Sequence, residues 1–189
     1  MIIFFSSFFL LVACSNVTGG GKKDYAFRDT YWGMTKEEVK KSVDDLDLIE
    51  KEDRYNKSLV DLNDSDYLFY KGYFPHLEYT EENAIVFFYF EKDKLVNAGY
   101  KFDSNYDFMT FGNDEAVNKL VKGIMDDLEE KCGKSEKKEI LEGYLNEYTW
   151  ESDRSIIKLR LDTGIKPSIT LSYISKEWWN DDGEEYDAL

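Results

Sequence analysis

The sequence is poor in the side chains that most often bind metals or act as nucleophiles, because its 189 residues include one histidine and two cysteines. One histidine (His76) and one free cysteine cannot supply a closed zinc site. A Cys132–His76 nucleophilic pair would also need an orienting third group and an exposed, electropositive thiol. Cys132 instead follows Leu128 by four residues on the apolar stripe of an expected helix, which predicts a buried structural thiol. The residue pattern therefore predicts no catalytic set, no metal site and no cofactor.

Basic residues are also scarce, with 24 lysines and arginines against 39 aspartates and glutamates and a net charge of -15. Such a chain repels phosphate backbones, and it has no basic cluster with interleaved aromatic residues. Nucleic acid is therefore not expected as a partner. The same charge disfavours lying flat on anionic lipid, so a membrane-bound form would need a covalent acyl anchor.

Positive charge is missing from the N-terminus, where no lysine or arginine precedes Lys22. The apolar run from Met1 to Ala13 is about 13 residues long, whereas a helix needs roughly 20 residues to cross a bilayer. A run of this length is typical of a signal peptide, although a signal peptide normally begins with lysine or arginine. The alternative is a buried N-terminal strand over residues 2–11, which the glycine-rich segment after it disfavours.

The end of this run, Leu11-Val12-Ala13-Cys14, resembles the lipobox of bacterial lipoproteins. In that family a peptidase cuts before the cysteine, and the cysteine thiol carries a diacylglycerol. The resemblance implies lipidation of Cys14 and a location on the cell membrane or outer membrane, outside the cytoplasm. An acylated Cys14 would leave Cys132 without a disulfide partner. The predicted parts are a signal peptide (1–13), a flexible tether (14–24), an α+β domain (25–175) and an acidic C-terminal tail (176–189).

The domain begins with a well-specified helix start. Thr35 and Glu38 have the spacing of a capping box, and Met34 and Val39 have that of a hydrophobic staple. Apolar residues then recur at helical spacing, which predicts a short amphipathic helix over about residues 36–46.

A second helix is expected between a cap at Asn113 and a terminal glycine at Gly133. Its apolar stripe comprises Val117, Leu120, Val121, Ile124 and Leu128. Apolar runs and alternations predict six strands, over residues 67–74, 84–90, 95–102, 144–150, 156–161 and 169–174. This order predicts an α+β fold with two layers, a largely antiparallel sheet and helices on one face. It also raises the hypothesis of a duplicated α-βββ unit.

Two acidic segments and one glycine run were considered as ligand sites. Asp103–Asp107 has the D-x-N-x-D spacing of a calcium loop, but Phe108 stands where that loop needs glycine. Asp61–Asp66 fails at the same position, so solvated turns are the favoured interpretation of both. The three glycines at 19–21 have no strand before them and no helix directly after them, so they are not a phosphate loop.

Aromatic residues make up 16% of the chain and favour a packed, β-rich body. Most are expected in the core, and any exposed group of them would be a candidate contact for protein or glycan. The residues in question are Tyr67, Phe69, Tyr70, Tyr73 and Phe74 in one segment, and Tyr144, Tyr148 and Trp150 in another.

The phrase Trp32-Gly33-Met34-Thr35-Lys36-Glu37-Glu38-Val39 resembles the W-G-M-S/T-x-E-x-V helix start of small bacterial lipoproteins. Their architecture is similar to BamE-like and β-lactamase-inhibitor-protein-like domains. The resemblance implies a binding module and carries over no functional residue, because the group has no common catalytic set.

Three functions follow as hypotheses. The first is a membrane-anchored, extracytoplasmic lipoprotein that acts as a non-enzymatic protein-interaction module and binds a protein partner in the cell envelope. The second is a glycan-binding surface lipoprotein. The third is a hydrolase with a carboxylate pair. Its mechanism would depend on the distance between the two carboxyl groups, which a sequence does not give.

Overall fold

The computed structural model describes residues 26–49, 66–72, 84–103, 115–142, 144–163 and 168–182. Three helices lie in these ranges: α1 (Lys36–Ser42), α3 (Glu115–Cys132) and α4 (Lys176–Asp182). No helix within the described ranges is both long and apolar enough to cross a bilayer. The strands are β1 (Tyr67–Gly72), β2 (Ala84–Glu91), β3 (Lys94–Asp103), β4 (Glu136–Leu141), β5 (Leu145–Glu151), β6 (Ser155–Asp162) and β7 (Ser168–Ser175).

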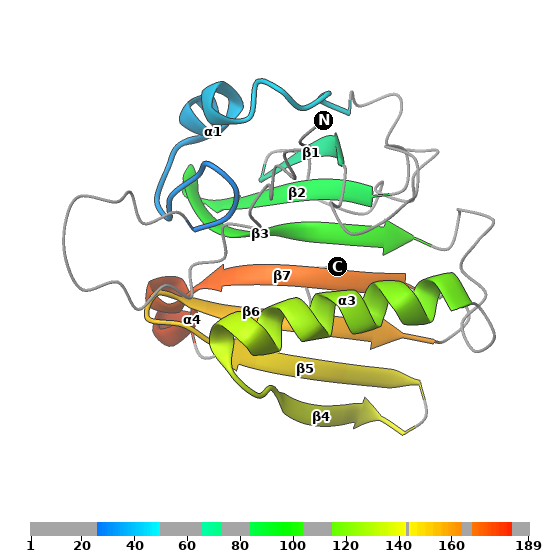
Figure 1. The fold of residues 1–189 in the computed structure, drawn as a ribbon. Helices are drawn as coiled ribbons and strands as arrows, with labels where there is room; N and C mark the ends of the chain where they lie inside the picture. The colour runs from blue at the N-terminus through cyan, green and yellow to red at the C-terminus, as the bar shows by residue number, and fades with distance from the viewer. Residues whose placement is uncertain are drawn as a thin grey trace, which may run out of the picture.

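The seven strands form one sheet in the order β1-β2-β3-β7-β6-β5-β4, and every neighbouring pair is antiparallel. Figure 1 shows this sheet with β3 and β7 at its centre. The predicted α+β class and antiparallel sheet are confirmed. Six strands were expected and the seventh, β4, was missed, because its sequence EKKEIL is charged and exposed along its whole length.

The first face of the sheet carries the main hydrophobic core. Val39 and Val43 reach this core from the α1 segment, and Leu120, Ile124 and Leu128 reach it from α3. The predicted stripe of the second helix is therefore confirmed at these three positions, with Val121 partly buried beside them. From the sheet, the core includes Val86, Phe88, Ala98, Tyr100, Trp150, Ile157, Leu159, Leu171 and Tyr173.

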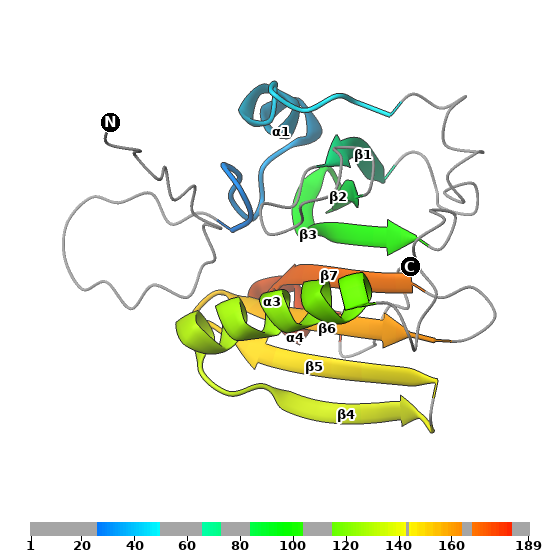
Figure 2. The ribbon, with the colours of Figure 1, turned by 45° about the vertical axis from the view of Figure 1, so that its right-hand side comes forward.

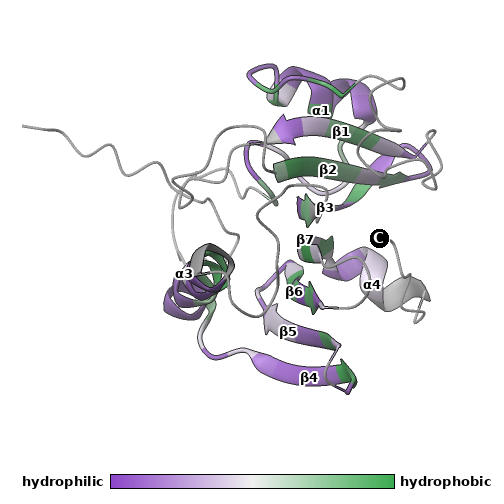
Figure 3. Cartoon of the chain, turned by 90° about the vertical axis from the view of Figure 1, so that its right-hand side faces the viewer, coloured by the Kyte–Doolittle hydropathy of each residue, from purple (hydrophilic) through white to green (hydrophobic). Residues whose placement is uncertain are grey.

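The second face, opposite the core, changes character across the sheet. Over β1 and β2 it is apolar, where Ile49 packs with Tyr67, Phe69, Ile85 and Phe87. Over β5, β6 and β7 its middle is polar, whereas Ile156 and Ile174 are buried at one end of these strands. Helix α4 lies on this face, on the opposite side of the sheet from α3 (Figures 2 and 3). The helices are thus not all on one face.

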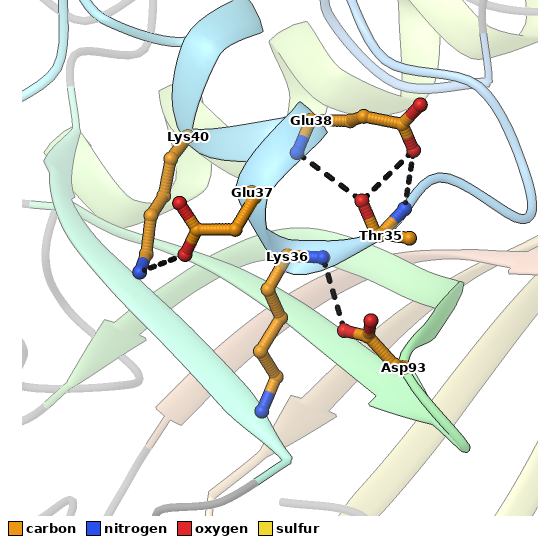
Figure 4. A network of polar contacts seen from close by, with 6 residues as sticks. All are labelled: Thr35, Lys36, Glu37, Glu38, Lys40 and Asp93. Carbon is orange, nitrogen blue, oxygen red and sulfur yellow. Dashed lines mark hydrogen bonds and ion pairs between the residues drawn. The ribbon is translucent and has the colours of Figure 1, made fainter.

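The start of α1 is fixed by the predicted capping box. The Thr35 hydroxyl accepts a hydrogen bond from the Glu38 N–H, and the Glu38 carboxylate accepts one of 2.8 Å from the Thr35 N–H. The Lys36 N–H donates to the Asp93 carboxylate at 3.2 Å, which ties α1 to the turn between β2 and β3 (Figure 4). The turn takes positive φ angles at Lys92 and Asp93, as a tight hairpin of this type requires.

The W-G-M phrase before α1 has a packing role. The Trp32 ring N–H donates to the Ser155 hydroxyl at 3.0 Å, which joins this segment to β6. Gly33 has a φ of +86°, a conformation that favours glycine, and its N–H donates to the Leu95 carbonyl at 2.9 Å. Met34 packs against the main core. The phrase therefore specifies how the chain enters α1.

The end of α1 and the start of the predicted C-terminal tail differ from the prediction. Helix α1 stops at Ser42 rather than near residue 46, because Asp44 and Asp45 are unfavourable at the negatively polarised end of a helix. Val43 and partly buried Leu46 still pack on the core, from a turn closed by the Leu46 N–H and the Val43 carbonyl. At the other end, helix α4 occupies the first residues of the segment predicted as an acidic tail.

Candidate binding surface

A straight row of charged side chains crosses the second face of the sheet. Residues directly opposite each other in antiparallel strands point to the same face. The register places Lys101 of β3 opposite Thr170 of β7, Thr170 opposite Arg160 of β6, and Arg160 opposite Glu147 of β5. Lys138 of β4 lies opposite Glu147 and ends the row. At about 4.8 Å between strands, the row is about 19 Å long. We call these five residues the basic row.

The centre of the basic row is a partly buried charge cluster. Glu147 lies 3.1 Å from the Lys158 ammonium and 3.5 Å from the Arg160 guanidinium, measured between the nearest charged atoms. The side chains of Glu147, Lys158 and Arg160 are only 4%, 13% and 21% exposed. Removing a charge from water is costly unless an opposite charge compensates it. The two cations therefore offset the cost of burying the Glu147 carboxylate.

The second face carries cations and anions in a fixed pattern. The basic row holds three cations, at Lys101, Arg160 and Lys138, against one anion at Glu147. The adjacent row, two residues along each strand, adds a cation at Lys158 and an anion at the exposed edge, Glu136. These two rows together hold four cations and two anions, in a chain whose net charge is -15. Asp162 and Glu151 lie in the next rows of the same face, so among the described side chains of β3 to β7 these four rows hold four cations and four anions.

Helix α4 covers the end of the second face nearest the charge cluster. The Trp179 ring lies over the Lys158 ammonium, 4.5 Å from ring centroid to nitrogen, a cation–π contact. The Trp178 ring N–H donates to the Glu91 carboxylate, and its ring meets Tyr89 edge-on at 6.0 Å. The Lys176 ammonium lies 2.9 Å from the Glu151 carboxylate. These contacts attach α4 to β2, β5 and β6.

The aromatic surplus is mostly internal, as predicted. Among the residues named from sequence, Tyr67, Phe69, Tyr70 and Trp150 are buried, while Tyr148 is partly buried. Tyr73 and Phe74 lie outside the described residues. Tyr144 is 57% exposed and lies beside exposed Leu141 at the tip of the β4–β5 hairpin. Among the described residues, Tyr144 is the one aromatic side chain that counts as an exposed large hydrophobic residue.

The structure corrects the prediction for Cys132. Its sulfur is paired in a disulfide, whereas a free buried thiol was expected. The sequence contains one other cysteine, Cys14, which lies outside the described residues. A sulfur that carries a diacylglyceryl thioether cannot also form a disulfide. Lipidation of Cys14 and a Cys14–Cys132 bond therefore exclude each other in one molecule.

Most of the other candidate sites of the sequence belong to parts of the chain outside the described ranges. His76, the glycines at 19–21 and nearly all of the two acidic loops lie outside the described residues. In the part of the chain that the structure describes, no cluster of three or more histidine, cysteine, aspartate or glutamate side chains could hold a metal ion. Glu147 is the one acidic side chain among the buried polar residues of that part, and it faces cations rather than a second carboxylate. This arrangement gives the carboxylate-pair hydrolase no support.

Sequence reasoning missed the charge cluster, although a signal was present. The segment IIKLRL of β6 alternates apolar residues with Lys158 and Arg160, and LNEYTW of β5 places Glu147 between Leu145 and Trp150. Alternation of this kind predicts one buried and one solvated face. The register of β5 against β6, which brings the opposite charges together, was not predicted.

Comparisons of the chain with protein-family models, with curated proteins and with solved structures found no match. The function is therefore argued from the residues of this chain.

Proposed function

We propose that this chain is a membrane-anchored, extracytoplasmic lipoprotein whose folded body is a non-enzymatic protein-interaction module. The anchor would be a lipid on Cys14, on the cell membrane or outer membrane. The sequence Leu11-Val12-Ala13-Cys14 after an apolar run of about 13 residues supports this part of the proposal. The resemblance of the W-G-M phrase to small lipoproteins of BamE-like architecture supports it further.

The observation that carries the interaction part is the fixed pattern of charges on the second face. A rigid antiparallel sheet presents four cations and four anions there. Charged groups arranged on a rigid scaffold favour selection of a partner by complementary charge. The central carboxylate of Glu147 is already paired with lysine and arginine. We therefore propose that this face binds a partner and does not catalyse a reaction.

The topology supports a duplicated unit as part of the same proposal. Each half of the sheet contains a helix followed by an antiparallel meander, α1 with β1 to β3 and α3 with β4 to β7. The last strands of the two halves, β3 and β7, lie side by side at the centre. We propose that the second half carries one extra edge strand, β4, relative to the first.

The anchor is tested by metabolic labelling with palmitate. The wild-type chain is expected to incorporate label and to sediment with membranes, and Cys14→Ala is expected to do neither. Equal labelling of both chains would overturn the anchor and leave the interaction proposal standing.

The interaction is tested by capture from detergent-solubilised membranes with two neighbouring variants. Lys138→Glu reverses a charge on the second face, and Lys137→Glu makes the same change on the first face of the same exposed strand. A partner recovered with wild type and Lys137→Glu, but lost with Lys138→Glu, is expected. Recovery of no partner, or equal recovery with both variants, would contradict the proposal.

A further inference from the structure

Three large apolar side chains are exposed together at the turn of the β4–β5 hairpin. They are Ile140, Leu141 and Tyr144, which are 37%, 59% and 57% exposed. Among the described residues, Leu48 at the opposite edge of the sheet is the one other exposed large hydrophobic side chain. Single exposed apolar residues are normal on a protein surface, whereas a group of them marks a candidate contact site. We call these three residues the hairpin tip.

The hairpin tip is held in place at the margin of the fold. Strand β4 ends the sheet on the side away from β1, and Figures 1 and 2 place the turn after it at a corner of the sheet. The Tyr144 N–H donates to the Leu141 carbonyl at 2.9 Å, which closes the turn. The Tyr144 carbonyl accepts hydrogen bonds of 2.8 and 3.1 Å from the N–H and the hydroxyl of Thr163, the residue after β6. The apolar side chains are therefore held at a corner, where a broad, flat partner can meet them.

Strand β4 itself is poorly suited to pairing with a strand of another chain. Residues 136–139 are all charged, and the pairing of β4 with β5 is interrupted between Glu139 and Leu141. Charged side chains and bulges protect the edges of natural sheets from strand addition. A contact at this corner is therefore expected to use the side chains of the hairpin tip rather than the backbone of β4.

The charge around the hairpin tip is balanced. Residues 134–144 contain three lysines and three glutamates, whereas the whole chain has a net charge of -15. Tyrosine and aliphatic side chains are favoured together where a membrane meets water, because the ring enters the apolar region and the hydroxyl stays hydrated. Exposed Glu142 lies in the turn, and the cationic group of a zwitterionic lipid can meet its carboxylate. The local chemistry therefore fits a zwitterionic lipid surface.

The hairpin tip and the proposed anchor can reach the same membrane. Near the N-terminal end of the described chain, the Phe27 ring packs on that of Tyr173 of β7, 5.2 Å between centroids. The register places Leu141 three strands across from Tyr173 and about five residues along, a straight-line distance of about 22 Å. The twelve residue steps from Cys14 to Ala26 span up to about 40 Å when extended. An anchor on Cys14 therefore allows the hairpin tip to touch the lipid surface.

We propose that the hairpin tip is a lipid-contact site that enters the headgroup region of a zwitterionic membrane. This inference rests on the proposed function, because the lipid on Cys14 would hold the body beside the membrane. Ile140, Leu141 and the Tyr144 ring supply the apolar contact. The contact orients the molecule with β4 toward the lipid and β1 away from it, so the second face stays open to a partner from the side.

Hydroxyl-radical footprinting of the full Cys14→Ala chain with phosphatidylcholine vesicles in excess, followed by peptide mass spectrometry, tests the contact without the lipid anchor. Oxidation of Leu141 and Tyr144 is expected to fall by about threefold with vesicles, because these side chains leave water. Leu48 is the internal control, and its oxidation is expected to stay the same.

Co-sedimentation with the same vesicles makes the test quantitative. Leu141→Ser combined with Tyr144→Ser, in the Cys14→Ala chain, is expected to weaken vesicle binding by about tenfold, because two apolar side chains are lost from the contact. Leu48→Ser is the matched control and is expected to leave binding unchanged. Vesicles that contain phosphatidylglycerol are expected to bind the chain less well, because both surfaces are then negative.

Four outcomes would overturn the proposal. The first is equal oxidation of Tyr144 with and without vesicles, and the second is equal protection of Leu48. The third is unchanged vesicle binding by the double serine variant. The fourth is protection of Tyr144 that appears without vesicles as the protein concentration rises, which would assign the hairpin tip to a second copy of the chain. Palmitate labelling tests the anchor separately, so a failure of the anchor is distinguishable from a failure of the lipid-contact site.

Discussion

The two faces of the sheet differ most over the C-terminal strands. On the first face, Ile157 and Leu159 of β6 lie beneath α3 in a continuous apolar core. On the second face, Lys158 and Arg160 of the same strand surround the Glu147 carboxylate. Alternate residues of one strand therefore serve different purposes: the first face stabilises the fold, and the second face holds charge in a fixed pattern at a cost in stability.

The largest expected effect is on the first face. Leu159 is fully buried, so Leu159→Ala should lower the free energy of unfolding by about 3 kcal/mol through lost transfer energy and a cavity. Urea denaturation checks this value. A loss no greater than that of an exposed-site control, Glu129→Ala on α3, would show that the first face does not hold the fold.

The next effect concerns the charge cluster. Glu147→Gln leaves two mostly buried cations without this carboxylate and should destabilise the protein by about 3 kcal/mol or slightly less, as measured by urea denaturation. A triple variant with Glu147→Leu, Lys158→Met and Arg160→Met replaces the whole cluster by apolar side chains. It is not expected to add to the loss, because a buried ion cluster and an apolar cluster of similar size are often nearly equal in stability. A triple variant much less stable than Glu147→Gln would mean that the cluster itself stabilises the fold.

Alkaline pH offers a smaller, graded test of the first face. Burial, with a lesser contribution from the Glu37 carboxylate, raises the pKa of Tyr70 to about 12. The unfolded chain loses this phenol proton near pH 10, whereas the folded chain keeps it until about pH 12. This contribution to stability is therefore complete below pH 10 and is lost as the pH rises toward 12, at about 1.4 kcal/mol per pH unit.

Tyr70→Phe should reduce the slope of unfolding free energy against pH in this window. Burial also raises the pKa of Tyr100, partly offset by the nearby Arg28 guanidinium, so some slope is expected to remain. A slope unchanged by Tyr70→Phe would contradict the assignment.

The smallest effect is expected where α4 meets the second face. Trp179→Ala removes the ring over Lys158 and should lower the free energy of unfolding by about 1 kcal/mol. Hydrogen exchange should increase in residues 176–182 and remain unchanged in α3. An equal increase in both helices would show that α4 is not an independent cover of the second face.

The sequence was most informative where local rules act alone. The capping box of Thr35 and Glu38, the stripe of Leu120, Ile124 and Leu128, and six of the seven strands could be predicted from spacing. Each of these signals depends on residues that are neighbours along one helix or strand.

The features that could not be predicted from the sequence depend on contacts between distant segments. The charges of β4 hide its strand pattern, and they are accommodated because β4 lies at the exposed edge of the sheet. Helix α4 depends on Trp178 and Trp179 meeting Tyr89 and Lys158, which no local pattern reveals. The charge cluster requires the register between β5 and β6, so the candidate surface could not be predicted from sequence.

The proposed function depends most directly on the chemistry of Cys14. Intact-mass measurement of the protein purified from membranes, after alkylation of free thiols, determines this in one step. We predict a chain that begins at Cys14 with a diacylglyceryl group on its sulfur. A chain that retains residues 1–13 and carries no lipid on Cys14 would contradict this prediction.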